Sequence, residues 1–270
     1  MVNQYERAYH AWAILTDAAA RRECEWLTYK DLAKRIGVHH RPLRYVLGLI
    51  QDYCLCEKLP PLTILAVSQS TLRPGVGFIA WDADDIEQGR EQVFGYPWRT
   101  QPNPFAFAAG GASYEGLVNT VAQSPEKSEE VYARIRVRGI AQQVFRDALL
   151  RVYDSKCAFT GFQFEVCLDA AHIIPWSEAT PAQRMDVRNG ILMSAVHHRL
   201  FDQRRMTVDE DYRIRFYDPR MLDDPPYSES DRSLTAALNG KKMLLPWNKD
   251  YWPNPEWIKR RNMSLGWECS

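Results

Sequence analysis

The sequence predicts an α+β fold built from two domains. Apolar residues recur at helical spacing in both halves of the chain, as in YERAYHAWAILTDAAARRE near its start. Short strand-like runs such as LDAAHII interrupt these helical patterns. Residues 99–128 are rich in Pro, Gly, Ala and Ser, which indicates a linker between domains at 1–98 and 129–270.

The composition favours a globular protein in a reducing compartment. The 34 Lys and Arg balance 34 Asp and Glu, so any surface for nucleic acid must be local. The first residues, MVNQYERAYHAW, lack the pattern of a signal peptide. No apolar run reaches the length of about 18 residues that a membrane-spanning helix needs. Because the six cysteines are scattered, we expect a cytoplasmic protein with free thiols.

The N-terminal block predicts two further helices followed by two strands. The run LTYKDLAKRIGV fits a helix with Thr28 as N-cap, Asp31 three residues later and Gly37 at its end. A second helix, HRPLRYVLGLIQDYC, follows at once, which is the pattern of a helix-turn-helix. The segment LPPLTILAVSQSTLRPGVGFIAW then predicts two strands around a Gly/Pro turn. This order predicts a winged-helix-like domain.

Basic residues concentrate around the second of these helices. Residues 30–45 hold five Lys and Arg against one Asp, a local charge of about +4 in a neutral chain. Such a patch suits contacts with DNA phosphates, although a solvated helix face is the ordinary reason for a charge run. We expect DNA contacts from Lys30, Lys34, Arg35, Arg41 and Arg44.

This block resembles the winged-helix DNA-binding domain of the O6-alkylguanine alkyltransferases and their alkyltransferase-like relatives. The resemblance covers TYKDLAKRIG, RPLRYVLGLI, LPPLTILAV and the PGVGF turn. Arg44 lies where that family places an arginine that fills the space left by a flipped base. The family's reactive Pro-Cys-His-Arg site is absent. The resemblance therefore implies DNA binding, including binding of an altered base, without alkyl transfer.

The second block carries the residues that indicate chemistry. Residues 140–153 have an apolar face at helical spacing. His172 follows in a strand-like run, where a lone histidine is usually a satisfied core residue. Here Asn189 stands in an Asn-Gly turn, and His198 and Asp202 are four residues apart, on one face of a helix. The order is strand His, turn Asn, helix His.

This order resembles the HNH nucleases with their ββα-metal fold. The leader RIRVRGIAQQVFRDALLRVYDSKCAFTG, then AAHIIPW and NGILMSAVHHRLFD, extend the resemblance over most of residues 130–260. It implies that His172 is the general base, that Asn189 holds the His172 ring by a hydrogen bond, and that His198 binds a metal. Asp202 takes the place of a further metal ligand.

The sequence departs from many HNH nucleases at one position. They carry an Asp or His ligand directly before the base, where this chain has Ala171. Strand alternation points Asp169 to the same side, so Asp169 is either a substitute ligand or a local hydrogen-bonding group. His and carboxylate ligands favour Mg²⁺ or Mn²⁺, with Zn²⁺ or Ni²⁺ as alternatives.

No structural zinc knuckle is expected. Thr160 stands where a CxxC pair would place its second cysteine after Cys157, and Cys167 is alone. We expect Cys157 and Cys167 to be small core residues.

The order of reader domain, linker and HNH domain resembles the modification-dependent restriction endonucleases. It implies a metal-dependent endonuclease that acts on double-stranded DNA, methylated or hypermodified. Since one HNH site cuts one strand, we expect a homodimer. The alternatives are a sequence-specific or homing-type HNH endonuclease on unmodified DNA, and a DNA-binding protein with an inactive nuclease fold.

Overall fold

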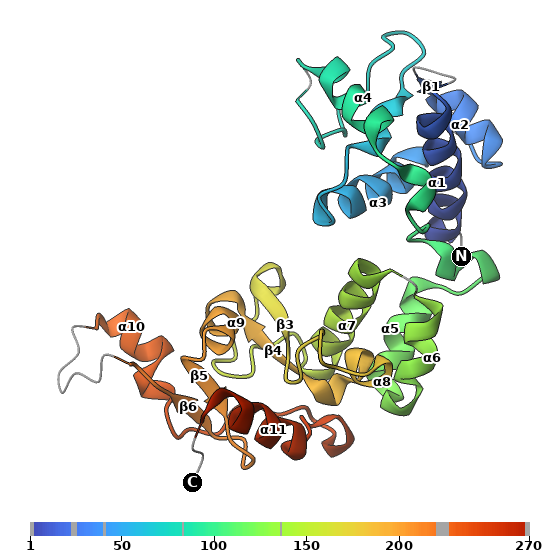
Figure 1. The fold of residues 1–270 in the computed structure, drawn as a ribbon. Helices are drawn as coiled ribbons and strands as arrows, with labels where there is room; N and C mark the ends of the chain where they lie inside the picture. Colours follow the sequence, from blue (N-terminus) through green and yellow to red (C-terminus); the bar gives the residue numbers. More distant parts are fainter. Residues whose placement is uncertain are drawn as a thin grey trace. The chain divides into compact units, whose positions relative to one another are not determined.

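The chain forms two compact units. The computed structural model describes residues 3–22, 26–39, 42–82, 84–135, 137–219 and 227–267. Unit 1 contains Met1–Tyr114 and Arg134–Ile140, and unit 2 contains Glu115–Ala133 and Ala141–Ser270. Helices and short strands occur in both units, which confirms the predicted α+β class (Figure 1). No helix within the described ranges is long and apolar enough to cross a membrane.

Unit 1 is mainly helical. Its elements are α1 (Gln4–Arg21), β1 (Leu27–Thr28), α2 (Tyr29–Arg35), α3 (Leu43–Cys56), β2 (Ala66–Val67) and α4 (Ile86–Gly95). The Thr28 hydroxyl accepts a hydrogen bond from the Asp31 amide, so the predicted N-cap of α2 is confirmed. Gly37 follows α2 with φ at 70°, a left-handed conformation that favours glycine.

Aromatic rings fill the core of unit 1. Trp12 on α1 makes edge-on contacts with Tyr53, Trp98 and Phe105, with ring centroids 5.5–6.2 Å apart. Trp12, Trp98 and Phe105 are almost fully buried. This packing holds α3 against α1, because Tyr53 belongs to α3.

The strand hairpin expected after α3 does not form. Leu62–Leu65 make a 3-10 turn, and β2 pairs in parallel with β1, with Leu27 opposite Ala66. Pro60 and Pro61 lack the amide protons that a ladder needs, and the apolar run that follows is buried on all sides. The two helices are present as predicted, but the described residues contain no wing hairpin.

Residues 99–128 are packed in the structure, where their composition indicated a linker. Phe105 and Phe107 are buried in unit 1. Leu117 and Val118 are buried on α5 (Tyr114–Gln123) in unit 2. The segment contributes apolar side chains to both units, because its apolar residues recur at helical spacing despite the many Pro and Gly.

Unit 2 is built around a two-stranded sheet followed by a helix. β3 (Leu168–His172) runs antiparallel to β4 (Gly190–Ser194), and α9 (Ala195–Asp202) follows β4 directly (Figure 1). The other elements are α6 (Ser128–Arg134), α7 (Arg138–Val152), α8 (Pro181–Met185), β5 (Met206–Val208), β6 (Ile214–Phe216), α10 (Glu229–Leu234) and α11 (Pro255–Leu265). β5 and β6 form a separate antiparallel pair.

Gly190 lets α7 pack closely on the sheet. A Cβ at this position would lie 2.5 Å from a methyl carbon of Leu149 and 2.6 Å from the ring of Phe145. Both side chains belong to α7 and are buried. The Asn-Gly pair therefore serves a close approach between helix and strand rather than a tight hairpin turn, and it brings Phe145 to the end of β3.

Candidate active site

The β3–β4–α9 unit positions the predicted site residues of unit 2. His172 is the last residue of β3 and Asp169 lies three residues earlier on the same strand. His198 lies on α9, whose first turn is capped by the hydroxyl of Ser194. Asp202 is the last residue of α9. The ββα arrangement brings Asp169, His198 and Asp202 together.

His198 lies between two carboxylates. Its Nδ1 is 3.2 Å from Oδ2 of Asp169, and its Nε2 is 3.5 Å from Oδ2 of Asp202. The His198 side chain is 28% exposed and both carboxylates are more open, so water and a phosphate group can reach them. The sequence left open whether Asp169 is a metal ligand or a local hydrogen-bonding group. In the structure its carboxylate lies within hydrogen-bond distance of His198, which is the predicted metal-binding histidine.

These groups fit a cation that keeps several coordination positions for water. Among the described residues, no group of three His, Cys, Asp and Glu side chains is arranged to hold a metal ion. Asp169 faces Nδ1 of His198 and Asp202 faces Nε2. Since one ring nitrogen binds a metal ion, His198 and only one of the two carboxylates could be ligands of the same cation. Mg²⁺ and Mn²⁺ are commonly held by one or two carboxylates plus water and phosphate oxygens.

Aromatic rings and one carbonyl fix the ring of His172. It stacks on Phe145 with centroids 4.1 Å apart and meets Trp176 edge-on at 5.6 Å. His172 Nε2 lies 3.1 Å from the carbonyl oxygen of Arg184. A carbonyl can only accept a hydrogen bond, so Nε2 carries the proton and the lone pair of a neutral ring is on Nδ1. Such a ring has one nitrogen that can take a proton.

Asn189 acts on the backbone around His172. Its Oδ1 accepts from the Ile174 amide at 2.8 Å, and its Nδ2 donates to the carbonyls of Ile174 and Gln183 at 3.2 and 3.0 Å. Both protons of the amide group are thereby used. The expected hydrogen bond from Asn189 to the His172 ring is replaced by this bracing, which fixes the chain on either side of the ring: Ile174 after β3, and Gln183 next to Arg184.

Sequence reasoning missed two arginines that support the site. Arg184 donates to the Trp176 carbonyl and to the Tyr132 hydroxyl, and lies over both rings. Arg261 on α11 is buried and donates to the carbonyls of Ile173 and Phe201.

Arg261 therefore joins the end of β3 to α9. Burial lowers the pKa of its guanidinium to about 10. No local pattern in the sequence marks either arginine, because their partners, three backbone carbonyls and the Tyr132 hydroxyl, lie near them only after folding.

Cys157 and Cys167 differ in their exposure to solvent. Cys157 is buried, as expected, but Cys167 is exposed, so its expected place in the core is wrong. Burial alone would raise the pKa of the Cys157 thiol, but hydrogen bonds from His197, Thr160 and nearby backbone amides lower it to about 6. His197 itself is buried and bonds to the Leu234 carbonyl, which leaves His198 to face the carboxylates.

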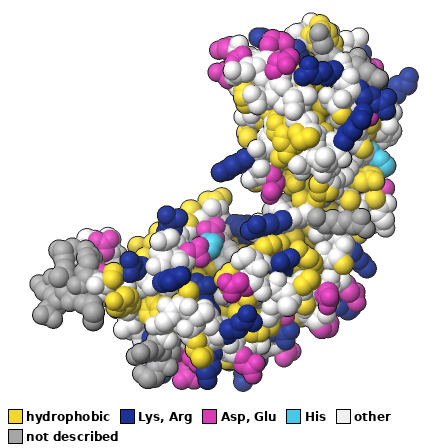
Figure 2. All heavy atoms as spheres, in the orientation of Figure 1, with side chains coloured by type: hydrophobic (Ala, Val, Ile, Leu, Met, Phe, Trp, Pro, Cys, Tyr) yellow, Lys and Arg dark blue, Asp and Glu magenta, His cyan; other side chains and the backbone are white. Residues whose placement is uncertain are grey.

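Unit 1 holds the residues expected to contact DNA. Lys30, Lys34 and Arg35 are exposed on α2, and Arg44 is exposed on α3, where it bonds to the hydroxyl of Tyr45. Figure 2 shows Lys and Arg side chains gathered over α2 on the face in view. Arg41 lies outside the described residues.

The ββα unit is similar to a known protein family. The family described as HNH endonuclease matches residues 157–209, which include β3, β4 and α9. We refer to residues 157–209 as the HNH domain after this match. No curated protein matches the chain.

The HNH domain contains every residue that the sequence assigned to catalysis and metal binding. His172, Asn189 and His198 occupy the strand, turn and helix of the matched region, with Asp169 and Asp202 beside them. HNH endonucleases are nucleases that generally use a divalent metal ion and act on DNA. The match therefore supports nuclease activity at the level of this domain.

Proposed function

We propose that this protein is a metal-dependent endonuclease that hydrolyses phosphodiester bonds of double-stranded DNA in its HNH domain. The observation that carries the proposal is that one ββα unit holds both a fixed histidine, His172 on β3, and a second histidine, His198 on α9, flanked by carboxylates. The first supplies a proton acceptor, and the second supplies donors for a divalent cation.

His172 acts as the general base. A neutral imidazole takes a proton from water near pH 7, and Nδ1 holds the lone pair that receives it. The carbonyl of Arg184 holds Nε2 and stabilises the cationic ring that results. Phe145 and Trp176 restrict the ring to one orientation, so the proton acceptor is already in place when water approaches.

Asp169 and His198 would hold the divalent cation. Asp202 would either hold the other nitrogen of His198 or act as the carboxylate ligand in place of Asp169. When bound, the cation stabilises charge on the phosphate and on the leaving 3′ oxygen. Mg²⁺ or Mn²⁺ is expected, with Zn²⁺ and Ni²⁺ as the alternatives. Ala171, in the usual ligand position, has no donor atom, so we assign the carboxylate of the strand to Asp169.

Unit 1 is proposed to bind DNA and to read a modified base, which makes the whole chain a modification-dependent restriction enzyme. The support is the exposed basic face of α2 together with Arg44 on α3. Because one HNH site cuts one strand, double-strand cleavage requires a homodimer. A sequence-specific or homing-type endonuclease on unmodified DNA is the second candidate.

An inactive nuclease fold is the third candidate. Ala171 in place of a ligand is the feature in its favour. The position of Asp169 supports an active site instead, because its carboxylate lies 3.2 Å from His198 Nδ1 and offers a donor that Ala171 lacks.

The test is cleavage of four DNAs with Mg²⁺ or Mn²⁺, with His172→Ala as control. The substrates are unmodified plasmid, plasmid carrying N6-methyladenine, plasmid carrying 5-methylcytosine, and hydroxymethylcytosine phage DNA. Cutting of one modified substrate alone supports modification dependence. Equal cutting of all four supports the second candidate, and no cutting with any metal supports the inactive fold.

A further inference from the structure

Three large apolar side chains of unit 2 are exposed in the segment before β3. Phe162, Phe164 and Val166 are 40%, 72% and 90% exposed, and the ring centroids of Phe162 and Phe164 lie 5.5 Å apart. Single exposed apolar residues are common on protein surfaces, whereas a contiguous patch of about 300–600 Å² is often functional. We call residues 162–166 the apolar loop.

Hydrogen bonds to the backbone fix the conformation of the apolar loop. The Phe162 carbonyl accepts from the Cys157 amide at 2.8 Å. At the other end, Arg146 on α7 donates to the carbonyls of Glu165 and Leu168. Because the backbone is already ordered, a partner that covers these side chains meets a smaller entropic cost than it would on a disordered loop.

The apolar loop lies beside the candidate active site. The strand that follows the loop pairs Leu168 with Ser194, which is the N-cap of α9. His198 is one turn further along α9, about 6 Å at 1.5 Å per residue. Asp169 follows Val166 by three residues, which span at most about 11 Å. Since bases are spaced about 3.4 Å apart in DNA, a duplex with a phosphate at Asp169 and His198 has neighbouring bases within reach of the loop.

The charges around the apolar loop suit a phosphate backbone. On α9, exposed Arg199 follows His198 directly and lies three residues after Val196, which is 51% exposed. Residues three apart are neighbours on a helix surface, so a positive and an apolar side chain lie together there. The acid of the loop, Glu165, is held by a hydrogen bond from the Ser155 hydroxyl.

The size and place of the apolar loop favour DNA over a second protein chain. Taking such a side chain at about 150–200 Å², the exposed parts of the three apolar residues total roughly 350 Å², against about 800 Å² that each partner buries in a stable protein interface. A protein on the loop would also crowd the carboxylates of Asp169 and Asp202, which are 44% and 57% exposed. A DNA substrate has to lie against these same carboxylates.

We propose that the apolar loop is a wedge that contacts the bases of double-stranded DNA beside the bond to be cut and partly unstacks them. The proposal rests on the nuclease function proposed above and names a contact between that same site and its substrate. Proteins that kink DNA insert apolar side chains such as Phe between base steps. Phe164 is the side chain that enters the stack, and Phe162 and Val166 support it on either side.

The test measures base stacking and affinity with the full chain bound to DNA in EDTA, so that no strand is cut. The probe is a short duplex in which 2-aminopurine, whose fluorescence is quenched by stacking, replaces several adenines. The anisotropy of a fluorescein at one end of the duplex gives the Kd. We expect saturating wild-type protein to raise the 2-aminopurine fluorescence about twofold or more, because a wedge separates neighbouring bases.

Two matched variants test whether the signal depends on the apolar loop. Phe164→Ser removes the wedge, and Met263→Ser changes a residue of α11 that is equally exposed, at 71%. Thermal unfolding should show both variants folded, since both side chains lie at the surface. Phe164→Ser should lose the fluorescence increase and bind about tenfold more weakly, with an unchanged slope of log affinity against log salt, because a phenyl ring neutralises no phosphate. Met263→Ser should match the wild type.

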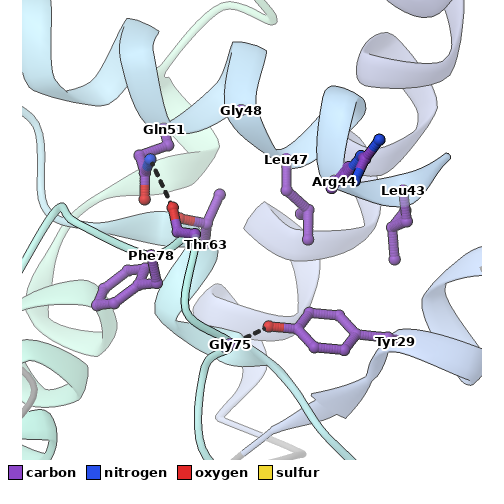
Figure 3. Close-up of a pocket in the computed structure, with 10 residues that line it drawn as sticks. Tyr29, Leu43, Arg44, Leu47, Gly48, Gln51, Thr63, Gly75 and Phe78 are labelled. Atoms are coloured by element: carbon purple, nitrogen blue, oxygen red, sulfur yellow. Dashed lines mark hydrogen bonds between the residues drawn. The ribbon is translucent and has the colours of Figure 1, made fainter. Parts of the chain in front are cut away.

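A third variant separates the apolar loop from unit 1. Arg44 lines a cavity in unit 1 (Figure 3), and its position in the sequence matches the arginine that fills the space of a flipped base in the alkyltransferases. The comparison of Phe164 with Ser is therefore repeated in the Arg44→Ala chain. The loss of fluorescence caused by Phe164→Ser should be the same in both backgrounds.

The outcomes distinguish the wedge from the nuclease function. A bound wild type without a fluorescence increase, or an increase that Arg44→Ala abolishes and folded Phe164→Ser keeps, would overturn the wedge alone. A dimer in sedimentation that Phe164→Ser dissociates, with unchanged fluorescence, would assign the apolar loop to a second copy of the chain instead. Failure of the wild type to bind any duplex would overturn the proposed function as well.

Discussion

Asn189 forms hydrogen bonds with backbone groups on either side of His172 in the candidate active site. We therefore predict that replacing Asn189 lowers both the stability of unit 2 and the rate of catalysis. Asn189→Ala deletes three hydrogen bonds, and the buried backbone groups of Ile174 and Gln183 lose these partners. At about 0.5–1.5 kcal/mol for each bond, the loss is about 2–4 kcal/mol in the unfolding free energy of unit 2. Movement of Arg184, next to Gln183, would also displace the His172 ring and lower kcat by about 100-fold.

Urea unfolding of the full chain measures this loss, read by hydrogen–deuterium exchange of peptides that cover β3 and β4. Asn189→Asp should be at least as unstable as Asn189→Ala, because it keeps the acceptor but places a carboxylate against two carbonyls. Asn248→Ala, which removes one exposed hydrogen bond, serves as the control and should stay within about 0.5 kcal/mol of the wild type. Wild-type stability of Asn189→Ala, with a reduced cleavage rate, would refute the bracing argument and restore a direct action on the ring.

Three further predictions concern other residues. Arg261→Ala removes two hydrogen bonds to buried carbonyls and should lower the unfolding free energy of unit 2 by about 3 kcal/mol or more, as urea titration would show. The pKa of the Cys157 thiol is lowered to about 6 in the folded chain, against about 8.5 in an unfolded one, so the unfolded state binds more protons between these values. The stability of the wild type over Cys157→Ala should therefore increase as pH rises from 6 to 8.5, and this increment should be absent below pH 6; a difference independent of pH would contradict it. Lys34→Ala should weaken binding to all duplexes alike and reduce the slope of log affinity against log salt by about 0.9 in titrations by fluorescence anisotropy, whereas an unchanged slope would show that Lys34 contacts no phosphate.

The residues of the HNH domain could be predicted because their spacing along the chain reflects local structure. His198 and Asp202 are four residues apart on one helix, and Asp169 and His172 lie on one strand, so the residue spacing indicates the element on which each of them lies. The helix expected at 140–153 is α7, Arg138–Val152. These features depend on short-range geometry that the residue types specify.

The bonds that hold the site could not be predicted in the same way. The carbonyls that accept from His172 and Arg261 belong to residues far from them in the chain, and any residue has a carbonyl. Asn189 was expected to hold the ring, but its amide group forms hydrogen bonds with three backbone groups of Ile174 and Gln183 instead. Only the fold decides which backbone groups meet a given side chain.

The prediction of a strand hairpin in the N-terminal block was wrong for a related reason. The segment from Leu62 to Val67 has the residue types of a strand, but the preceding prolines and the short β1 lead it into a turn and a parallel pair. The apolar pattern correctly predicted that this segment is buried, but it wrongly predicted a hairpin. A continuous apolar run is compatible with a buried strand and with a buried turn.

The central claim is that His172 activates water for phosphodiester hydrolysis in the HNH domain. Single-turnover cleavage of a DNA substrate with Mg²⁺ or Mn²⁺ tests it most directly, comparing the wild type with His172→Ala, whose fold is checked by thermal unfolding. We expect a 10²–10⁴-fold slower rate in the variant and no cleavage by the wild type in EDTA. Equal rates for a folded His172→Ala and the wild type would show that His172 is not the general base.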